Sequence, residues 1–200
     1  MFSWRWFFVV VIVLGAWHQC QHRAQKPVHQ ANGVLVQADP LQSMLDRGEV
    51  WQKDNYTIKA LADFAIEARV LSKEMYSSGR EADLSPVDLA LGWGPMSDSE
   101  VLSELNISQS NRFYFYRWED QPPRPPAEIA SHSANMHMIP ADAQIEKILK
   151  AVRPGQIIRL HGKLVEVSAP DGWRWQSSLT RDDTGAGACE LFRVESAEIL

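Results

Sequence analysis

The stretch IRLHGKLVEV, residues 158–167, decides the fold of this 200-residue chain. Before Gly162 apolar and polar residues alternate, as in a strand with one buried face, but beyond it the apolar positions shift to Val165 and Val167. A change of parity beside a glycine predicts a bulge or a sharp bend, because one extra residue turns the following side chains to the other face. Such a corner is typical of small barrels.

Further strands are predicted on both sides of this corner. Residues 64–70, FAIEARV, alternate in the same way and predict a strand with one buried face. Residues 112–118, RFYFYRW, are aromatic on both faces, which predicts a central strand or one under a covering element. Residues 173–181 and 189–194 complete the predicted strands, and the glycine-containing sequence between them predicts a turn.

Few helices are indicated. Residues 145–152 carry apolar side chains at helical spacing and lie between Pro140 and Pro154, which predicts one amphipathic helix. Residues 97–100 fit a Ser-x-x-Glu capping box and predict the start of another. The predicted fold is therefore α+β and mainly antiparallel β: a small OB-like barrel or curled sheet with two or three short helices, after an N-terminal membrane helix.

The first residues form an apolar targeting segment of the secretory type. Residues 1–17 read MFSWRWFFVVVIVLGAW, and the nearest candidates for a signal peptidase site, Ala16 and Ala24, lack a small residue two positions before them. This favours an uncleaved anchor over a cleaved signal peptide, although about 20 apolar residues are needed to span a bilayer comfortably. We predict a signal anchor or transmembrane segment at 1–20, a polar tether at 21–40 and a single globular domain at 41–200.

Composition and charge exclude several classes of protein. The net charge of −5 makes nucleic acid an unlikely partner, because proteins that bind phosphate backbones are normally basic. With two cysteines, Cys20 and Cys189, the chain is neither a disulfide-dense scaffold nor a four-thiolate zinc protein. It has no P-loop, G-x-G-x-x-G, G-x-S-x-G or H-E-x-x-H motif. No cofactor is predicted.

Two polar clusters hold the residues that are able to carry chemistry, at 131–140 and 177–190. His132 and His137 are five positions apart, so on a helix or a strand they point in different directions. We therefore predict no metal site, and expect one histidine to anchor its loop by hydrogen bonds. The candidate catalytic residues are His132, His137, Arg181, Asp183 and Cys189, and the candidate binding residues are Trp93, Asn135, Ser178 and Glu190.

Several of these residues have an alternative structural interpretation. Cys189 is either a nucleophile paired with a distant histidine such as His132 or a small buried side chain at the start of a strand. Arg181 and Asp183 belong either to a site or to an ion pair that fixes a turn. Trp93, between two glycines, is either a core residue or an exposed stacking surface.

Three stretches resemble the signature blocks of a family of uncharacterised bacterial proteins with an N-terminal membrane-targeting segment. They are ADLSPVDLALGWGPMSD at 82–98, HSANMHMIPAD at 132–142 and DGWRWQSSLTRDDTGAGACE at 171–190. The resemblance implies a location in the bacterial envelope and implies no activity, cofactor or catalytic residue. Any site that the protein has is expected in these blocks.

The leading hypothesis is a membrane-tethered, extracytoplasmic binding or scaffolding module of the bacterial envelope, without catalysis of its own. It would be a single-pass inner-membrane protein with its domain in the periplasm, or an exported protein if the signal is cleaved, and other envelope proteins are its expected partners. The competing hypothesis is a hydrolase or thiol enzyme that uses the histidine, cysteine, arginine and aspartate candidates. A third is an OB-like binder of oligonucleotides or oligosaccharides, of which the acidic balance disfavours the first.

Overall fold

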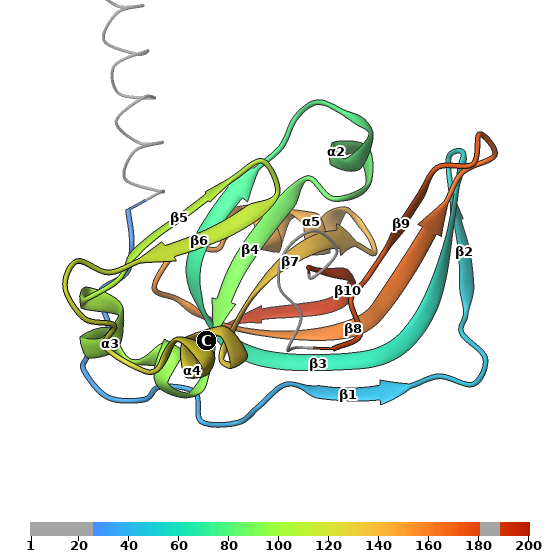
Figure 1. Cartoon of the computed structure of the whole chain (residues 1–200). Coiled ribbons are helices and arrows are strands. Elements are labelled where there is room, and N and C mark those ends of the chain that lie inside the picture. The colour runs from blue at the N-terminus through green and yellow to red at the C-terminus, as the bar shows by residue number, and fades with distance from the viewer. Residues whose placement is uncertain (1–25, 181–188) are drawn as a thin grey trace, which may run out of the picture.

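The computed structural model describes residues 26–180 and 189–200, and it has an α+β fold with mostly antiparallel strands and few short helices (Figure 1). An eight-stranded sheet contains β1 (Leu41–Met44), β2 (Val50–Lys53), β3 (Tyr56–Met75), β4 (Val87–Gly92), β7 (Ser133–Pro140), β8 (Ile157–Ser168), β9 (Arg174–Gln176) and β10 (Glu190–Ile199). A separate hairpin is formed by β5 (Asn106–Ser110) and β6 (Phe113–Arg117). The helices are α2 (Arg80–Leu84), α3 (Ser99–Ser103), α4 (Pro126–Ser131), α5 (Ala143–Ala151) and the 3₁₀ turn η1 (Gly94–Ser97).

The long strand β3 organises the sheet. It pairs with β1, β2 and β4 on one edge and with β8 on the other. Figure 1 shows β3 running along the lower side of the molecule and bending upward at both ends. The path of ladders from β3 through β4, β7, β10 and β8 therefore returns to β3. The ladder between β7 and β10 is parallel, and the others in this path are antiparallel.

The predicted irregularity in β8 is confirmed, but the extra residues lie on its neighbours. On β3 the register with β8 shifts at Leu61, and on β10 it shifts at Glu195, beside Gly162. A Cβ at Gly162 would lie 2.0 Å from the carbonyl oxygen of Arg193, so glycine is needed there for β10 to approach. The bulges let the long strands bend while their buried faces stay on the core.

The main hydrophobic core takes its side chains from β3, β4, β7, β8 and β10 and from α5. Phe64 and Phe192 meet edge to face at its centre, with ring centroids 5.1 Å apart. Helix α5 matches the helix predicted at 145–152, and Asp142 caps it by accepting hydrogen bonds from two backbone N–H groups of its first turn. A second cluster, on the opposite face of β7 and β10, includes Leu191 and the far ends of β3 and β8.

The prediction of a central strand at 112–118 is wrong. Within the described residues β6 pairs with β5 alone, through a two-residue turn at 111–112 with positive φ at both positions. Phe113 and Phe115 are 42% and 41% exposed, whereas the tyrosines between and after them face the protein. The aromatic run therefore has its tyrosines packed against the protein and its phenylalanines on an exposed face.

The capping box predicted at 97–100 is not formed, although the helix that it predicted is present. Helix α3 exists, but its cap is Asp98, whose Oδ1 accepts a hydrogen bond from the Glu100 N–H at 2.9 Å. The Ser97 hydroxyl instead accepts hydrogen bonds from the N–H groups of Leu35 and Val36, both at 3.0 Å. A serine that could cap a helix is thus used to hold the N-terminal segment.

The segment predicted as a polar tether, residues 21–40, contacts the sheet over its described part. The Val28 N–H donates to the Pro154 carbonyl at 2.8 Å, and Val36 is buried in the main core. Packing therefore begins before Leu41. The predicted membrane segment at 1–20 lies outside the described residues, and none of the helices that are described has the length and apolar character to cross a bilayer.

Candidate functional site

Three segments that are distant in the sequence meet on the face of β4, β7 and β10 that points away from the main core. Asp88 of β4 lies opposite His137 of β7, which lies opposite Leu191 of β10. Cys189 precedes Leu191 by two positions and therefore shares its face. The ring of Trp175 in β9 is 5.0 Å from that of His137. The three blocks singled out in the sequence thus each contribute to one place.

We call this group the Asp88 cluster. It consists of Tyr76, Asp88, Arg112, Asn135, His137, Trp175 and Cys189.

Asp88 is the centre of the cluster and is completely buried. Its Oδ1 accepts a hydrogen bond from Nη1 of Arg112 at 2.6 Å, and its Oδ2 is 3.0 Å from Nδ1 of His137. The second contact is an ion pair when His137 is charged. A carboxylate in this position needs both cations, because a buried charge without a partner is strongly destabilising.

Arg112 joins the hairpin to this face of the sheet. Its guanidinium lies 3.6 Å from the centre of the Tyr76 ring and 5.7 Å from that of Trp175. Its backbone N–H donates to the Tyr76 hydroxyl at 3.0 Å. The left-handed turn at 111–112 is what places this side chain against the outer face of β4 and β7.

Cys189 is half-buried, and its sulfur is surrounded by polar groups. Nδ2 of Asn135 donates to Sγ at 3.7 Å, and Sγ donates to the Arg112 carbonyl at 3.8 Å. Asn135 is itself fixed, because its Oδ1 accepts from Gln109 at 2.7 Å and its Nδ2 donates to the Arg112 carbonyl at 2.9 Å. Cys189 also lies close enough to His137 to raise the pKa of that histidine. These polar neighbours argue against the interpretation of Cys189 as a small buried apolar side chain.

The charge of His137 is set by opposing influences. Burial is the largest of these and by itself lowers the pKa of His137. The contacts with Asp88 and Cys189, through hydrogen bonding and charge, act in the opposite direction and together raise the pKa of His137 to about 9. His137 is therefore charged at neutral pH.

Two sequence candidates lie outside the cluster. His132 caps the C-terminus of α4, where its Nδ1 is 2.8 Å from the Glu128 carbonyl oxygen, so it anchors its loop as expected of one histidine. Trp93 is buried in the main core with its Nε1–H donating to Asp39 at 3.0 Å. It therefore offers no stacking surface.

The other candidates flank Cys189 in the sequence. Ser178 is buried, and its N–H donates to the carbonyl of Cys189 at 3.1 Å. Glu190 is buried on β10 and points to the opposite face from Cys189. Arg181 and Asp183 lie outside the described residues.

Four members of the cluster, Tyr76, Asp88, Arg112 and Trp175, were not candidates from the sequence. Asp88 had a usable signal, since it is an ionisable residue inside the otherwise apolar stretch VDLALG. Arg112 and Trp175 had none, because their neighbours are set by strand pairing between distant segments.

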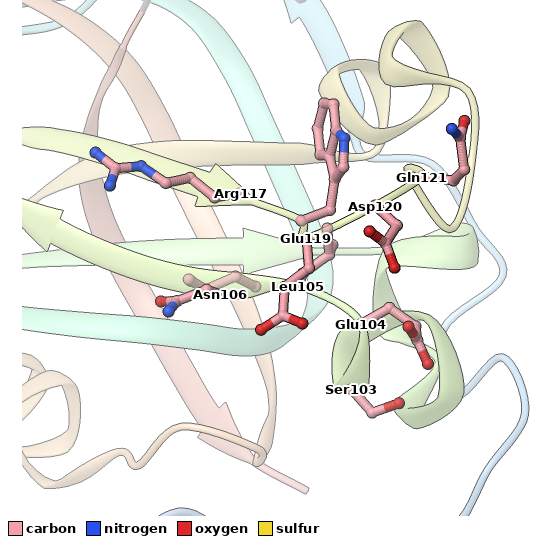
Figure 2. Close-up of a pocket in the computed structure, with 10 residues that line it drawn as sticks. Ser103, Glu104, Leu105, Asn106, Arg117, Glu119, Asp120 and Gln121 are labelled. Atoms are coloured by element: carbon pink, nitrogen blue, oxygen red, sulfur yellow. The ribbon is translucent and has the colours of Figure 1, made fainter.

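A polar hollow of about 800 Å³ opens elsewhere, at the base of the hairpin (Figure 2). Figure 2 shows that the carboxylates of Glu104, Glu119 and Asp120, from the end of α3 and the segment after β6, lie around this opening. Within the described residues these three side chains form no hydrogen bond or ion pair. The hollow is lined by Ser103, Glu104, Leu105, Asn106, Ile107, Arg117, Trp118, Glu119, Asp120 and Gln121.

In comparisons with known proteins, no family model, no curated protein and no solved structure matches this chain. The resemblance to a bacterial envelope family therefore stays a prediction. In the parts of the chain that the structure describes, no three His, Cys, Asp or Glu side chains are arranged to hold a metal ion.

The raised pKa of His137 predicts that stability falls with alkaline pH. The charged form is favoured in the folded state, so its contribution is complete below the ordinary value of 6.5 and is lost as pH rises through about 9. The loss is on the order of 3 kcal/mol in the free energy of unfolding. Urea unfolding across this range should show it in the wild type and in His132→Gln, but not in His137→Gln. Equal pH dependence in the wild type and His137→Gln would contradict this role.

Proposed function

We propose that this protein is a membrane-tethered, extracytoplasmic binding module of the bacterial envelope, built on an OB-like barrel, and that it binds a hydroxyl-rich glycan. The strand order supports the barrel: β3, β4, β7, β10 and β8 follow one another and return to β3, with β7 parallel to β10 and α5 between β7 and β8. OB barrels have five strands in a Greek-key arrangement of this kind. The apolar residues 1–17 support the tether.

The observation that carries the binding proposal is the polar hollow beside the hairpin. It is concave, and several polar side chains around it have no partner within the described protein, including Glu104, Glu119 and Asp120. Trp118 lies among them and packs in part against a small hydrophobic cluster of Met96, Leu105 and Ile129. A concave surface with an aromatic ring and convergent polar groups is the usual form of a ligand site.

The chemistry of the lining favours a glycan over other ligands. Three carboxylates repel phosphates, so a nucleic acid is disfavoured here, as it is by the net charge of −5. Carboxylates only accept hydrogen bonds, whereas the amides of Asn106 and Gln121 both donate and accept. Sugar hydroxyls complement both kinds of group, and oligosaccharides are known ligands of OB-like surfaces.

Only some of the residues named in the competing enzyme hypothesis lie together in the structure. His132 is engaged with α4, while Cys189 and His137 are in contact and Asp88 joins them. That contact favours thiol chemistry over metal-dependent or serine-type hydrolysis.

Removing two carboxylates from the hollow should weaken glycan binding. The full-length protein should co-sediment with purified peptidoglycan sacculi, and Glu119→Ala/Asp120→Ala should lower its affinity by about tenfold or more, since hydrogen bonds to charged groups are worth roughly 1.5–3 kcal/mol each. Glu81→Ala/Asp83→Ala, on α2, is the matched control and should bind normally. Wild-type protein that stays in the supernatant, or equal binding by the two variants, would refute the proposal.

Location is tested independently. Alkaline phosphatase fused after Leu200 should be active in cells, because this reporter matures only where disulfides form. The same fusion lacking residues 1–20 should be inactive. Inactivity of the full-length fusion, with activity of a cytoplasmic reporter at the same position, would show that the domain is not extracytoplasmic.

A further inference from the structure

Cys189 and His137 are brought together by the parallel pairing of β7 with β10. The pairing of Leu191 with His137 sets Cys189 two residues away on the same face, and the imidazole contacts the thiol. The thiol is half-buried rather than enclosed. The other cysteine, Cys20, lies in the N-terminal segment.

The neighbours of Cys189 are those that a reacting thiol requires. A thiol reacts as the thiolate, so it needs a nearby cation and hydrogen-bond donors to stabilise the resulting charge. His137, charged at neutral pH, is the cation next to the sulfur that favours the thiolate, and Asp88 lies against Nδ1 of that ring at 3.0 Å, which fixes its orientation. Asn135 supplies an N–H to the sulfur.

We propose that Cys189 is a reactive thiol that exchanges with small-molecule disulfides, with His137 and Asp88 as its positioning pair. The supply of disulfides rests on the extracytoplasmic location proposed above, whereas the reactivity of the thiol does not. Cys189 loses its proton to solvent, and the thiolate, stabilised by the charged His137, attacks one sulfur of a disulfide R–S–S–R. A Cys189–S–S–R bond forms, the R–S–S–R bond breaks, and the leaving thiolate takes a proton from solvent.

A disulfide fits this site better than an acyl substrate. Exchange needs a thiolate and open approach to the sulfur, whereas acyl transfer also needs donors for a tetrahedral oxyanion. Among the described residues, Asn135 is the side chain whose N–H donates to Sγ, and the same Nδ2 also donates to the Arg112 carbonyl. No oxidant beyond the disulfide is required.

The test uses full-length protein with Cys20→Ser, so that Cys189 is the only thiol. Oxidised glutathione should add one glutathionyl group, detected by intact mass, and 5,5′-dithiobis(2-nitrobenzoate) should give the rate. At about pH 6.5 the folded protein should react at least about tenfold faster than the same chain unfolded in urea, whose cysteine behaves as an ordinary thiol. This comparison needs no further substitution.

Substitutions then test whether His137 acts on the reaction of the Cys189 thiol or only supports the fold. His137→Gln should slow the reaction about tenfold at pH 6.5 and restore the steep pH dependence of an ordinary thiol, while His132→Gln, a matched control, should change neither. Cys189→Ser should abolish the reaction. A folded Cys20→Ser protein that reacts no faster than the unfolded chain, or a rate unchanged by His137→Gln, would overturn the proposal. Glycan binding and reporter location do not enter these rates, so a failure of either is distinguishable.

Discussion

The ladder between β3 and β8 is the interaction on which the rest of the structure depends. It joins residues 57–69 of β3 to 157–168 of β8 and returns the path of strand pairing to its start. Both strands bend so that they can pair along this length. The bend in β3 lies at the register shift at Leu61, and β8 has Gly162 where β10 approaches closely. Without it both strands would present unpaired edges. With it, β4, β7 and β10 have one face on the main core and another available for polar residues.

That second face carries the polar residues that are costly to bury. Asp88 has no contact with solvent, so its charge must be balanced inside the protein. One cation, His137, comes from the neighbouring strand, and the other, Arg112, comes from the hairpin. The hairpin therefore supplies a positive charge that the buried Asp88 requires, although within the described residues it forms no ladder with the eight-stranded sheet. The Asp88 cluster is therefore complete only when the hairpin is docked on the sheet.

Local patterns in the sequence predicted which segments form strands and helices better than they predicted which elements pack together. Alternation in residues 64–70 and the spacing in residues 145–152 are local, and both elements formed. The aromatic run at 112–118 misled, because strand composition does not say which partners a strand will have. The contact of Cys189 with His137 was not predictable, since it depends on the register of a parallel ladder between distant segments. Asp88 was detectable in principle as a charge in an apolar strand, and its partners were not.

The central claim is that the ion pair between Asp88 and Arg112 holds the hairpin against the sheet. A double-mutant cycle with Asp88→Asn and Arg112→Met, measured by urea unfolding at neutral pH, isolates their interaction. The account predicts a coupling free energy of about 2 kcal/mol, with each single variant also destabilised because it leaves a buried group unpaired. Strictly additive effects would contradict the account.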